Sequence, residues 1–275
     1  MGDDFTLQQE SKNAHKTIKL SDERFDLFQK WFSSSTSESG GNSEAAAGLA
    51  RSIDKLAPAG NKEEIDNFTW QTWNDFFQVA QQIPHDHPAQ DDLAQALVQL
   101  EQLLAGERKV DWAGLPQLGW VLRDWFNFAP TEKHAEGAGE ILSGWVNLNS
   151  FWARLGGLGS LNTIDITIWT LRQTLEEDHD EDATKFPSLF DSKVLAAAQY
   201  IEHSGRKLKQ FIEDGWKPQD DEAQIFRGGP LFDGPTGLTK ERWQFWLSRF
   251  KHVAEKASSE DAKSAASRAA QLLDE

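Results

Sequence analysis

Hydrophobic residues along the chain recur mostly at intervals of three and four positions, the spacing that places side chains on one face of an α-helix. The spacing is clearest in residues 192–212, and a second helix is predicted over 61–83, opened by a capping box of Asn61 and Glu64. Gly205 lies on the apolar stripe of the helix at 192–212, where a missing side chain would let another helix approach closely. The stripe comprises Val194, Ala197, Ala198, Ile201, Gly205, Leu208 and Ile212.

The same spacing predicts most of the remaining elements as helices. The Ser- and Gly-rich stretch at 33–43 has the composition of a flexible linker, and it joins the predicted helices at 21–32 and 42–56. The Ala-rich helix that begins near Ser259 is expected to be a loosely packed tail. These predicted helices cover 21–32, 42–56, 88–104, 116–127, 139–155, the residues after Thr239 and those after Ser259.

One segment fits two patterns. Ile164, Ile166 and Ile168 alternate as in a β-strand, but Ile164, Ile168, Leu171 and Leu175 also fit a helix, and an isolated strand would have no partner. We therefore expect a helix here and an all-α fold, a single globular multi-helix domain of about nine or ten helices with no sheet. Its expected parts are 1–60, a tail and two covering helices with the linker; 61–256, a helical core; and 257–275, the C-terminal tail helix.

Composition and charge narrow the possible functions. The 12 Trp and 17 Phe among 275 residues indicate a folded core. A net charge of −16 disfavours nucleic-acid binding, because phosphate backbones would be repelled. With no cysteine, thiolate chemistry and disulfides are excluded, and no apolar run is long enough for a membrane span. We expect an intracellular, cytoplasmic protein without a membrane or nucleic-acid partner.

Two histidines flank Asp86 in the stretch "QQIPHDHPAQDDL", and this pattern has two interpretations. His85 and His87 are potential ligands of a transition metal, with nearby carboxylates completing the shell. Alternatively, Pro84 ends one helix and Pro88 occupies the first position of the next, with Asp86 or His87 near its N-cap. The second interpretation accounts for more of the residues, and we predict no metal here.

The acidic run "EEDHDED" at 176–182 surrounds His179 with carboxylates. A divalent-cation site is one interpretation, but the ligands lack regular spacing and there is no turn glycine. A solvated loop with mutually repelling charges explains the composition better. We expect no metal and no cofactor.

The helix after Thr239 has two distinct faces. Trp243 and Trp246 belong to an apolar stripe that is expected in the core, whereas Arg242, Phe245 and Arg249 fall on the opposite side. Two arginines around an exposed Phe, next to the Gly/Pro loop "GGPLFDGPTG", would either bind an anionic or aromatic ligand or clamp the loop through its carbonyls. These three residues are the candidate ligand-binding site.

Three stretches resemble a known family: "IWTLRQTLE", "AAAQYIEHSG" and "GGPLFDGPTGLTKERWQFWLSRF". Their sequences and order are similar to those of a fungal family of uncharacterised proteins, domain of unknown function 3632, over roughly residues 60–256. The resemblance implies an intracellular, mostly helical fungal protein. It implies no reaction, cofactor or catalytic residue.

The chain contains no nucleophile elbow of the form G-x-S-x-G and no P-loop. The leading hypothesis is therefore a helical protein that binds a protein partner or small ligand in a Trp/Arg-lined groove. The alternative is an enzyme of unassigned chemistry, such as one of fungal secondary metabolism, that uses an aromatic pocket.

Overall fold

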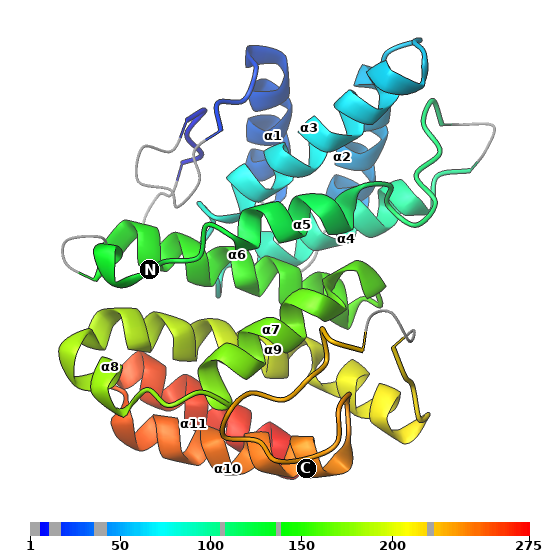
Figure 1. Cartoon of the computed structure of the whole chain (residues 1–275). Coiled ribbons are helices and arrows are strands. Elements are labelled where there is room, and N and C mark those ends of the chain that lie inside the picture. Colours follow the sequence, from blue (N-terminus) through cyan, green and yellow to red (C-terminus); the bar gives the residue numbers. More distant parts are fainter. Residues whose placement is uncertain (1–5, 11–17, 36–42, 105–107, 136–138, 219–222) are drawn as a thin grey trace. The chain divides into compact units, whose positions relative to one another are not determined.

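The structure is a computed structural model, and it describes residues 6–10, 18–35, 43–104, 108–135, 139–218 and 223–275. Across these ranges it contains eleven α-helices, two short 3-10 turns and no strand, which confirms the expected all-α class (Figure 1). Contacts divide the chain into two compact units, Met1–Ala129 and Pro130–Glu275. The predicted domain limits at 60 and 256 differ from this division and stay a prediction.

The described residues of the first unit contain five helices, and all five begin within two residues of the positions expected from the hydrophobic spacing. As predicted, the Asn61 side chain accepts from the Glu64 N–H, and the Glu64 carboxylate accepts from the Asn61 N–H, both at 3.1 Å. The predicted linker at 33–43 lies mostly outside the described residues, although Ser33–Ser35 continue the first helix. The helices are α1 (Asp22–Ser35), α2 (Ser43–Leu56), α3 (Lys62–Ala80), α4 (Ala89–Glu101) and α5 (Leu118–Phe126).

Three buried tryptophans in the first unit, Trp73, Trp112 and Trp125, donate the indole N–H to an acceptor. Trp73 donates to the Pro116 carbonyl at 2.7 Å, and Trp112 donates to the Asp54 carboxylate at 2.8 Å. The two rings meet edge to face with centroids 5.6 Å apart. Such pairing removes the cost of burying a polar N–H, so the large aromatic surface stabilises the core.

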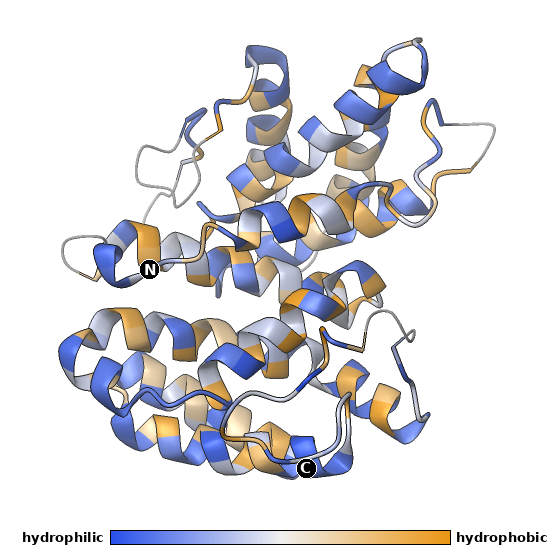
Figure 2. Cartoon of the chain, viewed as in Figure 1, coloured by the Kyte–Doolittle hydropathy of each residue, from blue (hydrophilic) through white to orange (hydrophobic). Residues whose placement is uncertain are grey.

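The second unit is built around its longest helix, α9, which packs against α6, α7, α8 and α11. Apolar and polar residues alternate around these helices, so most are amphipathic (Figure 2). None of the helices described is both long and apolar enough to cross a bilayer. The helices are α6 (Gly139–Gly157), α7 (Ile164–Leu175), α8 (Asp180–Lys185), α9 (Pro187–Glu213), α10 (Lys240–Lys256) and α11 (Glu260–Asp274).

Small and polar residues join α6 to α9. Ser204 on α9 donates to the Ala153 carbonyl on α6 at 2.5 Å, and Tyr200 donates to Asn149 at 2.9 Å. A Cβ at Gly157 would overlap the His203 carbonyl oxygen, whereas a Cβ at Gly205 would make only ordinary contacts of 3.6 Å or more. The close helix approach predicted at Gly205 therefore depends on Gly157 instead.

The C-terminal helix α11 is firmly packed, so the expected loose tail was wrong. Ala262, Ala266 and Ala270 are buried against α9 and α10. At the start of α11, Asp191 on α9 accepts from the backbone N–H of Ser258 and Ser259 at 2.9 and 2.8 Å. The sequence has few large apolar side chains here, which suggested loose packing. Its alanines are nevertheless buried, because they are small enough for close contact between helices.

Candidate functional site

Glu176, the first acid of the acidic run, is fully buried at the end of α7. Its carboxylate accepts hydrogen bonds from the Gly229 N–H (2.6 Å) and the Trp246 indole (2.7 Å). Arg242 supplies two more, from Nε at 2.7 Å and from Nη2 at 3.1 Å. A buried carboxylate tolerates this position only because a full set of donors and an opposite charge replace water.

Arg242 is equally buried, and its guanidinium is saturated by this chain. Besides Glu176, it donates to the carbonyl oxygens of Phe226 (2.6 Å), Gly237 (3.0 Å) and Arg227 (3.4 Å). These five bonds match the five N–H groups that an arginine carries. These contacts are the ones expected if Arg242 holds the loop through its carbonyls, and they leave Arg242 no N–H group for a ligand.

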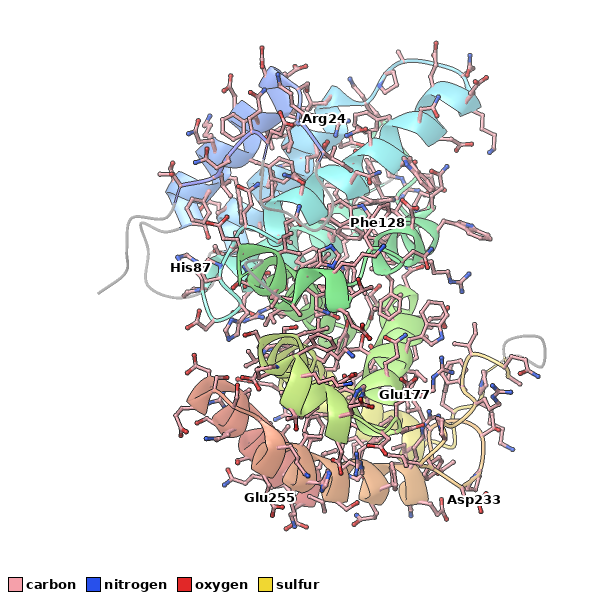
Figure 3. All side chains as sticks on the ribbon, turned by 60° about the vertical axis from the view of Figure 1, so that its left-hand side comes forward. Arg24, His87, Phe128, Glu177, Asp233 and Glu255 are labelled. Atoms are coloured by element: carbon pink, nitrogen blue, oxygen red, sulfur yellow. The ribbon has the colours of Figure 1, made fainter. Side chains whose placement is uncertain are left out.

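The Gly/Pro loop between residues 226 and 239 is held against α7 and α10; its position beside the start of α10 can be followed from Asp233 in Figure 3. The Leu231 N–H donates to the Glu176 carbonyl at 2.9 Å, and the Gly237 N–H to the Phe226 carbonyl at 3.1 Å. A Cβ at Gly229 would lie 2.7 Å from the Glu176 carbonyl oxygen, so this contact needs glycine.

Phe245 and Arg249 also contact this chain. The Phe245 ring packs on Phe232 of the loop with centroids 5.2 Å apart, so Phe245 is half-buried and the expected exposed ring was wrong. Arg249 is half-buried and donates from Nε to the Leu175 carbonyl at 2.8 Å. Ligand binding by Arg242, Phe245 and Arg249 stays a prediction, but the contacts shown are with the loop and α7.

The sequence predicted a solvated loop for the acidic run, and this prediction was wrong for part of it. Part of it forms α8, and His179 is buried, donating from Nε2 to the Gln173 carbonyl at 2.6 Å. A hydrogen bond and the positive charge of Lys256, with a smaller effect of His252, lower the pKa of Asp180. No three His, Asp or Glu side chains in the described residues are placed to hold a metal ion.

The "HDH" turn joins α3 to α4. His87 Nδ1 accepts from the Ala89 N–H at 3.1 Å, and the imidazole stacks on Phe32 with centroids 5.7 Å apart. Pro88 is the N-cap of α4, one position before the predicted one, a shift within the usual uncertainty of helix ends. His87 thus satisfies one of the free N–H groups at the start of α4.

We expect His85→Ala and His87→Ala to leave the metal content of the purified protein unchanged. His87→Ala removes one hydrogen bond and one ring contact, so the free energy of unfolding should fall by about 1 kcal/mol. Elemental analysis and urea denaturation measure both quantities. Stoichiometric zinc or iron that is lost in either variant would show that the turn is a metal site.

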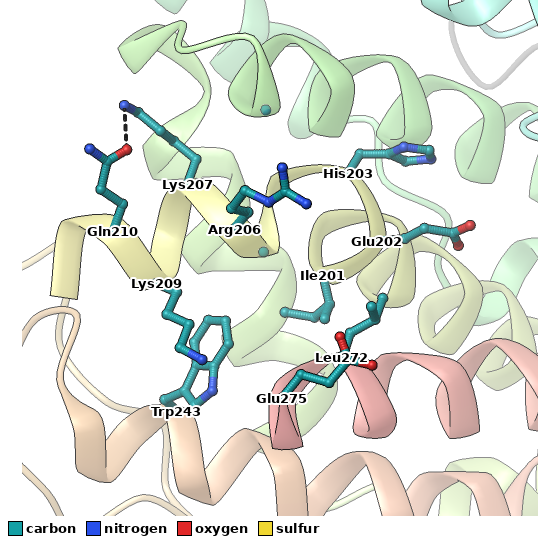
Figure 4. A pocket seen from close by; sticks show the side chains of 12 residues that line it. Ile201, Glu202, His203, Arg206, Lys207, Lys209, Gln210, Trp243, Leu272 and Glu275 are labelled. Atoms are coloured by element: carbon teal, nitrogen blue, oxygen red, sulfur yellow. Dashed lines mark hydrogen bonds between the residues drawn. The ribbon is translucent and has the colours of Figure 1, made fainter. Parts of the chain in front are cut away.

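A cavity of about 680 Å³ opens between the C-terminal half of α9, the start of α10 and the end of α11 (Figure 4). Ile201, Trp243 and Leu272 give it an apolar lining. Arg206 and Lys209 add positive charge from α9, and Lys209 extends toward the Trp243 ring. A second cavity of about 350 Å³ shares Lys209 and Trp243 with the first, so the two adjoin and form what we call the α9–α11 groove.

Two cations of the groove have side chains without a partner among the described residues. The side chains of Arg206 and Lys209 make no hydrogen bond or ion pair there, whereas Lys207 donates to Gln210 at 3.1 Å. Glu202, at the rim, pairs with Arg268 of α11 at 3.8 Å. Part of the negative charge near the cavity is therefore offset, while Arg206 and Lys209 face the solvent-filled space.

The hydrophobic spacing does not indicate these groove residues. The stretch "HSGRKLK" at 203–209 has the pattern of a charged helix side, and its position beside α11 carries no local signal. The sequence does contain a signal for the burial of Glu176. Glu176 follows Ile168 by eight residues and so falls on the apolar face of α7, where a carboxylate needs a buried partner.

Comparison with known families assigns the chain through its central and C-terminal parts. The family model described as "Protein of unknown function (DUF3632)" matches residues 73–250, more than half of the chain. The chain belongs to the DUF3632 family. The match covers Glu176, Arg242 and Trp246, so the buried cluster lies within the DUF3632 region, as do Arg206 and Lys209 of the groove. No curated protein and no solved structure matches this DUF3632 chain.

Proposed function

We propose that this DUF3632 protein is a binding protein, and that the α9–α11 groove receives an anionic group of its ligand or partner. The observation that carries this proposal is the pair Arg206 and Lys209, whose side chains have no hydrogen-bond or ion-pair partner among the described residues and lie beside Trp243. The lining also includes the carboxylates of Glu202, Glu213, Asp274 and Glu275, so the proposal rests on direct contact of an anion with Arg206 and Lys209 and not on the net charge of the groove.

The groove has the general properties of a ligand site. Its larger cavity, about 680 Å³, lies in the range of about 300–1,000 Å³ typical of small-molecule pockets. Trp243 is anchored, since its indole donates to the Leu273 carbonyl at 2.8 Å, and the other walls are helices. Apolar and charged side chains held together on helices favour binding with a defined orientation.

Binding is favoured over catalysis by the exposure of the groove's polar groups. Glu202, Arg206 and Gln210 are all exposed, so their side chains remain hydrated. Catalytic acids, bases and anion-stabilising groups are effective mainly where water is excluded. The best-excluded charges of the second unit, Glu176 and Arg242, are instead bonded to each other and to the loop.

The proposal is tested with inorganic pyrophosphate as the probe and the ¹⁵N-labelled full chain. Because the Trp243 indole lies at the groove, its NMR signal should shift on titration at low salt, while that of Trp73 in the first unit should not. Trp243→Phe assigns the signal. Arg206→Glu with Lys209→Glu should weaken the interaction about ten-fold, since repulsion replaces two attractive charges.

Lys251→Glu serves as the matched control. It replaces one cation by a carboxylate, half of the charge change in the double variant, at an exposed position on α10 outside the groove. The titration with this variant should follow that of the unaltered chain within about two-fold. A Trp243 signal that does not respond, or an equal response in the Arg206/Lys209 variant, would refute the groove as an anion site.

A further inference from the structure

Cations and carboxylates share the α9–α11 groove without pairing with each other. In the part of the chain that the structure describes, several charged side chains of the groove make no hydrogen bond and no ion pair. Opposite charges are thus held in one groove beyond ion-pair distance, and both signs remain free to contact a ligand. These side chains are the cations of Arg206, Lys209 and Lys240 and the carboxylates of Glu213, Asp274 and Glu275.

The two signs of charge lie on different walls of the larger cavity. Arg206 and Lys209 project from α9, whereas Glu275 lies at the end of α11 (Figure 4). The other carboxylate of this cavity, Glu202 on α9, is paired with Arg268 at 3.8 Å. A molecule that carries both charges is attracted by both walls and oriented by them, whereas a molecule of one sign is attracted by one wall and repelled by the other.

Apolar side chains line the same cavity. Ile201, Trp243 and Leu272 contribute to the lining, and Leu272 has 38% of its surface exposed. A hydrocarbon part of a ligand that covers these side chains is removed from water, which is favourable. This contribution is needed, because exposed ion pairs by themselves add little to affinity.

We propose that the ligand of the groove is a small zwitterionic molecule in which a hydrocarbon chain joins an anionic group to an ammonium group. This inference rests on the proposed function, because the anionic group would bind Arg206 and Lys209. The ammonium group would bind the carboxylates of Asp274 and Glu275, and the hydrocarbon chain would pack on Trp243. The cavity volume of about 680 Å³ is of the size that encloses a small molecule.

Three molecules with the same six-carbon chain test the two charges separately: 6-aminohexanoate, hexanoate and hexylamine. At about pH 7 the first carries both charges, the second only the negative charge and the third only the positive charge. Each is titrated at low salt into the ¹⁵N-labelled full chain while the indole NMR signal of Trp243 is followed. The affinity for 6-aminohexanoate should exceed that for either comparison molecule about five-fold, since it gains one more exposed ion pair.

Asp274→Asn with Glu275→Gln should lower the affinity for 6-aminohexanoate about five-fold, to that for hexanoate. The same variant should bind hexanoate equally well or up to about two-fold more tightly, because it no longer repels the anion. Glu260→Gln with Asp261→Asn is the matched control, since it makes the same change in charge at the other end of α11, outside both cavities. It should leave both affinities within about two-fold. All four positions are exposed, so the variants should fold, as circular dichroism checks.

The outcomes separate this inference from the proposed function. If pyrophosphate shifts the Trp243 signal but 6-aminohexanoate binds no more tightly than hexanoate, the zwitterion inference is wrong while the anion site stands. The inference is also wrong if hexylamine binds as tightly as 6-aminohexanoate, or if the Asp274/Glu275 variant binds 6-aminohexanoate as the unaltered chain does. If neither pyrophosphate nor any of the three molecules shifts the signal, both proposals fail.

Discussion

Replacing Arg242 by alanine is expected to lower the free energy of unfolding by about 3–5 kcal/mol, the cost typical of breaking a buried ion pair. The variant leaves the Glu176 carboxylate fully buried with only Gly229 and Trp246 as donors. It also removes the hydrogen bonds that hold the loop at Phe226 and Gly237. The uncompensated charge dominates, since each neutral hydrogen bond contributes only about 1 kcal/mol.

Urea denaturation followed by far-UV circular dichroism measures this loss. Arg249→Ala is the matched control: it truncates an arginine on the same helix that donates one hydrogen bond from Nε to the Leu175 carbonyl, and it should cost about 1 kcal/mol. Arg242→Met with Glu176→Gln removes both charges and should recover part of the stability. A loss for Arg242→Ala no larger than that for Arg249→Ala would contradict the buried-charge explanation.

The second large effect is expected from Gly157→Ala, which should destabilise the protein by about 3 kcal/mol. The new methyl group would overlap the His203 carbonyl oxygen on α9. Backbone atoms cannot rotate away as a flexible side chain can, so α6 and α9 must separate. This separation would also lengthen the short hydrogen bond from Ser204 to the Ala153 carbonyl.

Gly205→Ala, on α9 and in the same unit, is the control for this substitution. A Cβ there would lie 3.6 Å from the Ile201 side chain and 4.0 Å from the Trp243 ring, which are ordinary contacts. Because alanine favours the helical conformation, this variant should be unchanged or more stable by up to about 1 kcal/mol. Thermal and urea unfolding compare the two variants. Equal effects would mean that the α6–α9 approach does not depend on Gly157.

The helices and several of their ends follow from the sequence by itself. The capping box of Asn61 and Glu64 forms as predicted, and the helix expected after Thr239 begins there, with the Thr239 side chain accepting from the Arg242 N–H at 3.2 Å. The isoleucines at 164, 166 and 168 lie in a helix, as the continuation of their spacing indicated. These features were predictable because period and capping depend on residues within a few positions of one another.

Burial of charge was decided by the tertiary structure. Glu176 and Arg242 are 66 positions apart, and their pairing arises only because α7 and α10 pack together. Within the acidic run, Glu176 is buried whereas Glu177 is half-buried, although the two have the same local composition. Which acid loses its water depends on where α7 ends against α10, and a contact between distant segments leaves no trace in a short window of sequence.

The candidate site shows the same limit. The sequence predicts that Trp243 belongs to a core stripe, and the structure confirms this, since Trp243 is buried on α10. It did not indicate that Arg206 and Lys209 lie beside Trp243 and the end of α11. Hydrophobic periodicity determines which face of each helix is buried, because that depends on spacing along one helix. The packing of three helices decides which side chains share a groove, because side chains far apart in sequence meet only when the faces are in contact.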